Sequence, residues 1–205
     1  MKKLFLATTL IALAIPAFGQ EGSERWDGDR RMAITANLTP ILVGAFTGGF
    51  GMGAGFEFAP GPSASARLNL YYIGFDSALM GEEGGDGLHL LRLNLDGRWY
   101  PQNVYARGWF LNGGLQYHAI IAPQVFWGVN GEDLSGTMNT WSVMAGVGYK
   151  FVARSTQRVA FVIEPKLDFV WAVHSDIPRM PGDFALRMIL GTGGPRFSLM
   201  MGAAF

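Results

Sequence analysis

The chain of 205 residues is 49% hydrophobic and 13% aromatic, carries 16 basic and 16 acidic residues, and contains no cysteine. This even charge balance gives no reason to expect a nucleic-acid partner, and the lack of cysteine excludes disulfides and thiolate-bound metals. The three histidines, His89, His118 and His174, lie far apart in the sequence, so we expect neither a metal nor another cofactor.

Residues 1–19 have the pattern of a secretory signal peptide. Lys2 and Lys3 precede an apolar run, and small residues occupy the positions that signal peptidase reads before a cut after Gly19. The apolar run is shorter than the roughly 20 residues that cross a bilayer as a helix. Removal of the two lysines leaves 14 basic against 16 acidic residues. Residues 20–31 are then a short polar lead in the periplasm.

The rest of the chain, residues 32–205, is expected to cross a membrane as a barrel. No later apolar stretch approaches the roughly 18 residues of a membrane helix, and the 29 glycines would be costly in helix interiors. Lipid tolerates only helices and closed barrels across it. A membrane-spanning chain of this composition must therefore be a β-barrel.

Alternation of apolar and polar side chains predicts the strands. In Phe50–Phe58, large apolar residues and alanine alternate with glycine and Glu57, as expected where one face meets lipid and the other lines a barrel. Eight such segments predict an all-β, antiparallel up-and-down barrel: 32–42, 50–58, 66–72, 89–99, 109–121, 141–151, 159–171 and 184–205. Phe184–Leu190 alternates separately before a glycine-rich link, and a glycine bulge can join both parts into one strand. A ten-stranded barrel is the alternative.

The links between these segments alternate in length. The short ones are 59–63, 101–106 and 153–157, and the longer ones are 75–87, 122–139 and 173–183. Periplasmic turns are short and external loops are long in outer-membrane barrels, so we place the long links outside. They are acidic, and Glu82, Glu83 and Asp86 are either solubilising residues or contacts for an external surface ligand.

Aromatic residues fall near the predicted strand ends, as membrane-interface girdles do. The outer girdle is expected to contain Tyr72, Trp141 and Trp171, and the periplasmic girdle Trp99, Trp109, Tyr149, Phe151 and Phe205.

The chain ends in an apolar stretch of period two: Phe197, Leu199, Met201, Ala203 and Phe205. This stretch resembles the closing strand of bacterial outer-membrane barrels, in which it is the assembly signal. Together with the signal peptide and the eight segments, it makes the chain similar to small barrels of the OmpW/OprG, OmpA transmembrane-domain and opacity-protein type. The resemblance implies a monomer in the lipid of the bacterial outer membrane, inserted by the barrel-assembly machinery.

The same alternation places charged side chains inside the barrel, where an eight-stranded wall leaves little room. The predicted lumen network contains Glu57, Arg67, Arg92, Asp96, Arg98, Lys150, Glu164, Lys166 and Asp168. Buried charges must be paired, so these residues form either a structural plug or the lining of a narrow pore. The glycines of the second and sixth strands leave space beside the charges and keep the pore interpretation open.

Three functions follow for a chain of this kind. The first is a narrow channel for small solutes, including apolar ones that would enter near Tyr71, Met144, Phe126 and Trp127 and leave sideways into lipid. The second is a closed structural or surface-interaction barrel. The third, a lipid hydrolase using His174-Ser175-Asp176, is disfavoured because adjacent strand residues point to opposite faces. No enzymatic activity is expected.

Overall fold

The computed structural model describes residues 30–46, 48–75, 87–102, 105, 107–129, 132–155, 159–176 and 193–205, and within them only the backbone of 122–129, 132–135 and 153–155. The predicted signal peptide and the alternating stretch Phe184–Leu190 lie outside the described residues.

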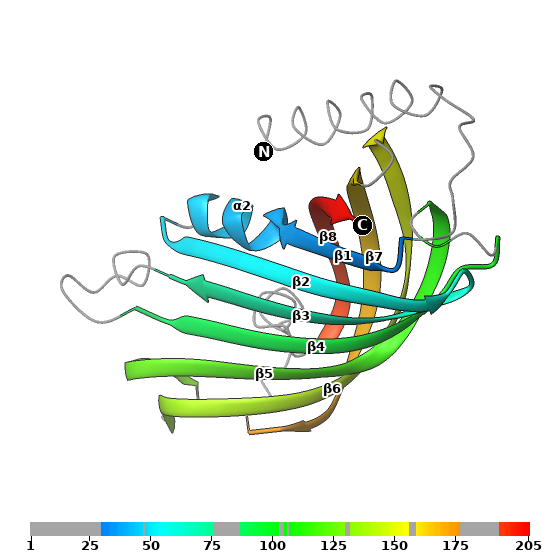
Figure 1. The fold of residues 1–205 in the computed structure, drawn as a ribbon. Coiled ribbons are helices and arrows are strands. Elements are labelled where there is room, and N and C mark those ends of the chain that lie inside the picture. Colours follow the sequence, from blue (N-terminus) through cyan, green and yellow to red (C-terminus); the bar gives the residue numbers. More distant parts are fainter. Residues whose placement is uncertain are drawn as a thin grey trace.

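The described residues form a closed barrel of eight antiparallel strands, each hydrogen-bonded to its neighbours in chain order. The strands are β1 (Met32–Asn37), β2 (Phe50–Gly61), β3 (Ala64–Gly74), β4 (His89–Trp99), β5 (Gly108–Val129), β6 (Glu132–Ser155), β7 (Ala160–Ser175) and β8 (Gly193–Ala204) (Figure 1). The wall closes where β8 pairs with β1. The prediction of an eight-stranded up-and-down barrel is confirmed.

The two faces of the wall differ as the alternation predicts. On β2, Phe50, Met52, Phe56 and Phe58 are exposed on the outside, while Glu57 is 1% exposed inside. The same pattern runs through β3 to β8, with leucine, tryptophan and phenylalanine outside and polar side chains buried within. An apolar exterior around a polar interior is the arrangement of a barrel surrounded by lipid.

The strands are strongly staggered. Tracing paired residues from Ala36 through β2, β3, β4 and β5 reaches β6 at Trp141. Tracing them through β8 and β7 instead reaches β6 at Phe151. This offset requires strands that tilt steeply against the barrel axis. Side chains from opposite walls can then meet across the narrow lumen.

The first strand is shorter than predicted. β1 ends at Asn37, and the chain continues as helix α2 (Leu38–Phe46). Asn37 caps this helix, because its Oδ1 accepts a hydrogen bond from the backbone N–H of Thr39 at 2.9 Å. Pro40 lies in the first helical turn, where no backbone N–H is needed. The prediction of a lipid-facing strand as far as Leu42 is therefore wrong.

Helix α2 lies at the end of the barrel away from the short turns, beside β2 (Figure 1). Among the described residues no helix is long and apolar enough to cross a membrane.

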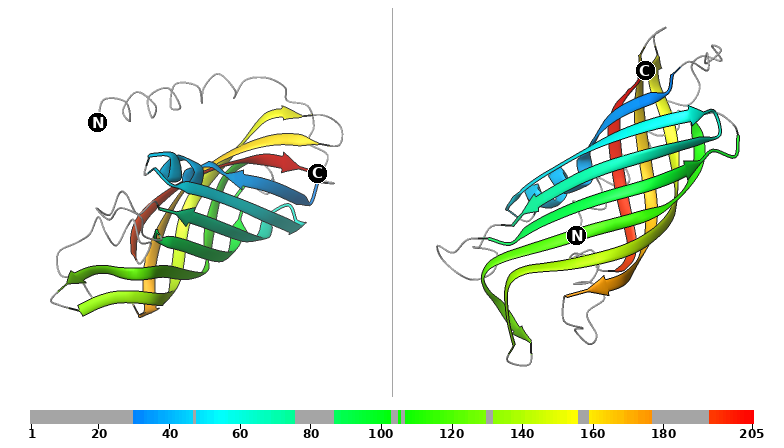
Figure 2. Two further views of the ribbon diagram at one scale, coloured as in Figure 1. Left: turned by 90° about the vertical axis from the view of Figure 1, so that its left-hand side faces the viewer. Right: turned by 60° about the horizontal axis from the view of Figure 1, so that its bottom comes forward.

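Strands extend into four of the predicted links. β5 and β6 continue through most of 122–139, β6 continues to Ser155, and β7 continues to Ser175. β2 likewise extends through Gly61, which leaves Pro62 and Ser63 as the turn. Strand pairing overrides the polar and glycine-rich composition of these segments, because antiparallel hairpins can extend beyond the lipid. Figure 2 shows the β5–β6 hairpin projecting from the wall.

The predicted girdle residues lie on the outer face, although Trp141 lies within β6 and not near its end. Trp99, Trp109, Trp141 and Trp171 are exposed, Tyr72, Tyr149 and Phe151 are half-buried, and Phe205 is exposed at the chain end. Trp109 packs edge-on against Tyr149, with ring centroids 5.0 Å apart. The predicted assembly signal also lies on the outer face of β8, with Phe197, Leu199, Met201 and Ala203 exposed or half-buried, while Ser198, Met200 and Ala204 are buried.

Candidate functional site: the barrel lumen

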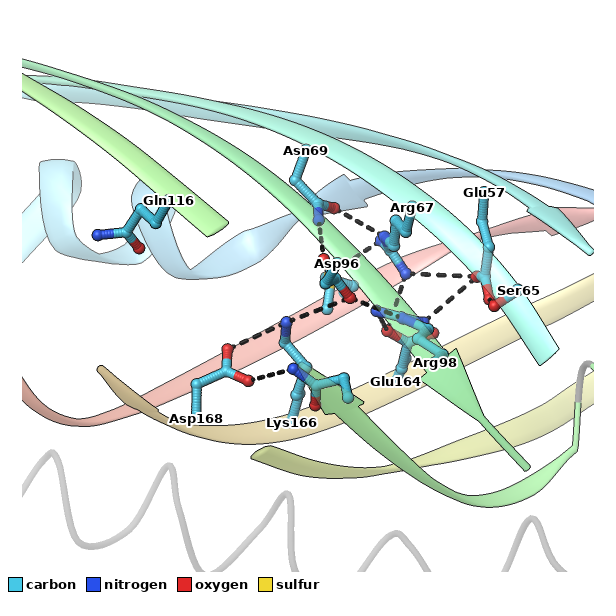
Figure 3. A network of polar contacts seen from close by, with 12 residues as sticks. Glu57, Ser65, Arg67, Asn69, Asp96, Arg98, Gln116, Glu164, Lys166 and Asp168 are labelled. Atoms are coloured by element: carbon cyan, nitrogen blue, oxygen red, sulfur yellow. Dashed lines mark hydrogen bonds and ion pairs between the residues drawn. The ribbon is translucent and has the colours of Figure 1, made fainter. Parts of the chain in front are cut away.

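Eight charged side chains fill the lumen near the end that carries the short turns. This salt-bridge layer consists of Glu57, Arg67, Asp96, Arg98, Lys150, Glu164, Lys166 and Asp168. Figure 3 labels all of them except Lys150. All eight side chains are buried, and they come from β2, β3, β4, β6 and β7. The structure therefore brings together every predicted lumen charge except Arg92, with four acids against four bases.

Two glutamates form the centre of the salt-bridge layer. Arg67 Nη1 lies 2.8 Å from Glu164 Oε1 and 3.6 Å from Glu57 Oε2. Arg98 also contacts both carboxylates, at 3.3 Å and 2.9 Å, and Lys150 Nζ lies 2.9 Å from Glu57 Oε2. Three cations shared by two carboxylates tie β2, β3, β4, β6 and β7 to one another.

The two aspartates extend the layer. Asp96 accepts hydrogen bonds from Arg98 Nε and Asn69 Nδ2, both at 3.0 Å. Asp168 Oδ2 lies 3.0 Å from Lys166 Nζ, and its Oδ1 accepts a hydrogen bond from Asn112 at 2.8 Å. Buried carboxylates with several donors are tolerable in a low-dielectric lumen.

The glycines facing the lumen do not leave an open path. A Cβ at Gly148 would overlap the ring of Phe110, and one at Gly146 would overlap Asp168. On β2, a Cβ at Gly55 would overlap Asn69. The expectation of free space beside the charges is wrong for these positions, because neighbouring side chains fill the space.

Between the salt-bridge layer and the short turns, aromatic residues pack inside the barrel. Tyr100 and Tyr105 come from the β4–β5 link and pack with Phe110 in a buried cluster. Tyr100 donates a hydrogen bond to Glu57 Oε1 at 2.6 Å, and Lys150 Nζ lies 4.6 Å from the Tyr105 ring centroid. Burial raises the pKa of both phenols well above 10, and the Glu57 carboxylate adds to this.

Sequence reasoning missed several polar partners in the lumen. Ser65 and Tyr100 both donate to Glu57 at 2.6 Å, and Arg67 Nη2 donates to Thr35 Oγ1. Arg196 on β8 donates to Gln116 Oε1 on β5. The signal for Arg196 was its place one residue before lipid-facing Phe197, which puts it on the inner face.

Farther toward α2 the lumen is apolar at its mouth. Phe75, Leu88, Leu90, Ile120 and Met138 form a buried cluster, and Val43 of α2 and Ile73 pack against it. This mouth cluster is separate from the pocket predicted near Tyr71 and Met144, which are buried deeper on β3 and β6. For the other two predicted pocket residues, Phe126 and Trp127, the structure describes only the backbone.

The wall beside α2 differs from the rest of the barrel. β1 pairs with only 200–204 of β8 and 54–58 of β2. Its 6 residues span about 20 Å along the strand, or about 14 Å of membrane depth at a tilt near 45°, whereas the lipid-facing band of such barrels is about 25 Å tall. Helix α2 therefore completes the wall between β2 and β8.

Specific contacts hold α2 in this position. The Leu199 N–H of β8 donates to Thr39 Oγ1 at 3.0 Å, and the Gly49 N–H donates to the Gly44 carbonyl at 2.8 Å. Gly51 allows close approach, since a Cβ there would overlap the Pro40 carbonyl. Apolar Ile41, Leu42 and Phe46 remain exposed on the helix. Helix α2 thus carries exposed apolar side chains and is held against β2 and β8.

The remaining candidates form no catalytic or metal site within the described residues. Ser175 Oγ lies 2.8 Å from Thr140 Oγ1, whereas His174 Nε2 pairs with Asp176 Oδ1 at 3.2 Å on the exposed surface. His89 Nδ1 lies 2.8 Å from the Tyr72 hydroxyl. The described part of the chain contains no group of three potential metal ligands.

A closed antiparallel barrel with an apolar exterior and a charged, filled lumen defines the class: an outer-membrane β-barrel protein of eight strands. No protein-family description and no curated protein matches this sequence.

Three solved structures have a similar arrangement. The N-terminal β-barrel domain of Pseudomonas aeruginosa OprF shares 13% identity over 87% of this chain and 98% of its own, with a TM-score of 0.41. A major outer membrane protein from Thermus thermophilus shares 16% over 86% and 98%, with a TM-score of 0.43. Acinetobacter baumannii CarO shares 10% over 89% and 99%, with a TM-score of 0.36. These identities are too low to transfer the role of any residue.

Proposed function

We propose that this protein admits small apolar solutes at its external mouth and releases them sideways into the outer membrane through the wall beside α2. The observation that carries this proposal is the length of β1, which leaves helix α2 to complete the wall between β2 and β8. The apolar mouth cluster and the salt-bridge layer support the same route, because apolar side chains at the mouth suit apolar solutes and buried, paired charges disfavour their passage along the axis.

A disulfide that fixes α2 to β8 tests the route. The chain has no cysteine of its own, and Thr39 Oγ1 lies 3.0 Å from the Leu199 backbone nitrogen, so Thr39→Cys/Leu199→Cys places two cysteines at neighbouring positions. Uptake of N-phenylnaphthylamine, a neutral apolar dye, is measured in cells that produce the protein. We expect oxidation to slow uptake and a reductant to restore it.

The single Leu199→Cys variant is the control, because it cannot form the crosslink. Equal uptake by the oxidised and reduced double variants would contradict lateral release. Planar-bilayer recording gives a second check, since the filled lumen predicts no current. Reproducible current steps from folded protein would contradict the closed axis.

A closed barrel without transport is the second candidate. It is favoured by the complete pairing of four acids with four bases in the salt-bridge layer. It predicts the same absence of current, but dye uptake that does not respond to the disulfide.

A further inference from the structure

The β5–β6 hairpin extends beyond both of its neighbouring strands. β4 pairs with β5 only as far as Ile121, and β7 pairs with β6 only as far as Thr140. Beyond these positions β5 and β6 pair with each other as far as Val129 and Glu132. We call residues 122–129 and 132–139 the external ribbon, which projects from the wall in Figure 2. Within the described residues, neither outer edge of this ribbon pairs with a further strand.

The β6 edge of the external ribbon has a backbone donor and acceptor ready for pairing. The Asn139 carbonyl accepts a hydrogen bond from the Asp176 N–H at 2.9 Å, and the Asn139 N–H donates to Asp176 Oδ2 at 3.3 Å. In an antiparallel sheet, every second residue directs its N–H and C=O toward the same neighbour. Thr137 therefore presents these groups on the side where β7 has ended, and no described residue pairs with them there. Thr137 is also exposed.

The β5 edge of the ribbon is blocked. Pro123 has no N–H, and it lies two residues beyond Ile121, where pairing with β4 ends. The register between β5 and β6 also shifts twice in the ribbon, with the extra residues on β5. Proline and bulges keep edge strands from pairing with other chains. β6 has no proline in the ribbon, and its φ of 92° at Gly136 is a conformation that glycine adopts without strain. The β6 edge is therefore the one suited to an added strand.

The charge of the ribbon indicates which strand would be added. Residues 122–139 contain Glu132 and Asp133 but no lysine or arginine. Asp176, next to the open position, adds an exposed carboxylate. A second copy of this chain would bring the same acids against each other, and like charges on paired strands are destabilising. A basic segment would instead be attracted to this edge.

We propose that the β6 edge of the external ribbon binds an extended, cationic peptide segment by strand addition. The first pairing position is the Thr137 backbone, in the place that β7 leaves beyond Ser175. Backbone hydrogen bonds supply affinity in this mode of recognition, and Glu132 and Asp133 favour basic side chains. This binding is separate from the lateral release of apolar solutes, which uses the wall beside α2.

The probe is a fluorescein-labelled peptide of alternating lysine and valine. Its binding is measured by fluorescence anisotropy on the full mature protein in phosphatidylcholine nanodiscs, with the signal of empty nanodiscs subtracted. One comparison peptide alternates glutamate and valine. The other keeps lysine and valine but carries methyl groups on alternate backbone nitrogens, so it has the same charge and cannot pair as a strand. We expect the unmodified lysine peptide to bind about tenfold more tightly than either, which corresponds to about one net hydrogen bond.

Two substitutions separate backbone pairing from charge. Thr137→Pro removes the edge N–H and should weaken the lysine peptide about tenfold, whereas the matched control Thr137→Ala keeps this N–H and should bind normally. Glu132→Gln/Asp133→Asn should weaken binding about fivefold. Its control is Glu82→Gln/Glu83→Gln, an acidic pair in the predicted link 75–87, which should have no effect. Unchanged heat-modifiable gel mobility verifies that each variant is folded.

Equal binding of the glutamate peptide would overturn the assignment of a cationic partner. Equal binding of the methylated peptide would overturn strand addition, and this comparison still decides the question if Thr137→Pro does not fold. Equal loss in both acidic double variants would place the attraction in the overall charge and would overturn the assignment to the ribbon. Failure of the lysine peptide to bind would overturn the whole proposal, while the dye-uptake measurement decides lateral release separately.

Discussion

The substitution Glu57→Gln tests whether the salt-bridge layer holds the barrel together. The carboxylate accepts hydrogen bonds from Ser65, Tyr100, Lys150 and Arg98 at 2.6 to 3.3 Å. Glutamine keeps one acceptor oxygen but places an amide against a cation, and it leaves the buried layer with one positive charge in excess. Removing one partner of a buried ion pair costs about 3–5 kcal/mol, and we expect the free energy of unfolding to fall by about this amount.

Equilibrium urea unfolding in lipid vesicles, followed by tryptophan fluorescence and gel mobility, measures the change. Asp176→Asn removes an exposed carboxylate and should cost less than about 1 kcal/mol. The double variant Glu57→Gln/Lys150→Met removes both charges and should recover part of the loss, because no unpaired charge remains. A loss below about 1 kcal/mol for Glu57→Gln would refute the view that the layer braces the wall.

Three further outcomes are expected. Gly51→Ala should displace α2 and destabilise the barrel by about 1–3 kcal/mol, measured by urea unfolding. Gly97→Ala is the control, because its Cβ would meet its nearest atom at 3.9 Å, and it should change stability by no more than about 0.5 kcal/mol. Equal effects of the two substitutions would contradict the packing of α2 against Gly51. Burial and a neighbouring carboxylate raise the pKa of Tyr100 and Tyr105. Stability should therefore fall as the pH rises above about 10, because the unfolded chain releases these protons first. An ultraviolet titration in which every tyrosine of the folded protein ionises near that pH would disprove this pH dependence. Asn37→Ala removes the cap of α2 and should cost about 1 kcal/mol, measured as a lower urea midpoint, and an unchanged midpoint would argue against capping.

The strands could be predicted because each has one face in lipid and one in the lumen. Period-two alternation is a local signal, and it placed Glu57 and Arg98 inside and Trp141 outside without knowledge of the rest of the chain. Helix α2 could not be found this way, because Leu38 and Leu42 fit an alternating pattern as well as a helix. Asn37 and Pro40 were the available signals, as a helix cap and as a residue that strand ladders disfavour.

The partners within the lumen could not be predicted from alternation alone. Glu57 and Lys150 lie on β2 and β6, and their meeting at 2.9 Å depends on the stagger of all eight strands. Tyr100 falls between the predicted strand 89–99 and the predicted turn 101–106, and no role was expected for it, yet its hydroxyl donates to Glu57. Arg196 was overlooked because Pro195 and the glycines before it indicate a link, whereas pairing with β7 continues through them.

The short first strand also affects how the barrel closes. β1 is joined to β8 over five paired residues, whereas β3 and β4 are joined over eleven. The first and last strands pair only when the sheet curls into a closed barrel. Because this pairing is short, it adds few backbone hydrogen bonds. We therefore expect this seam to form last during insertion and to separate first on heating. Helix α2 contacts Leu199 through Thr39, and it therefore holds β8 in place beside the short first strand once the barrel has closed.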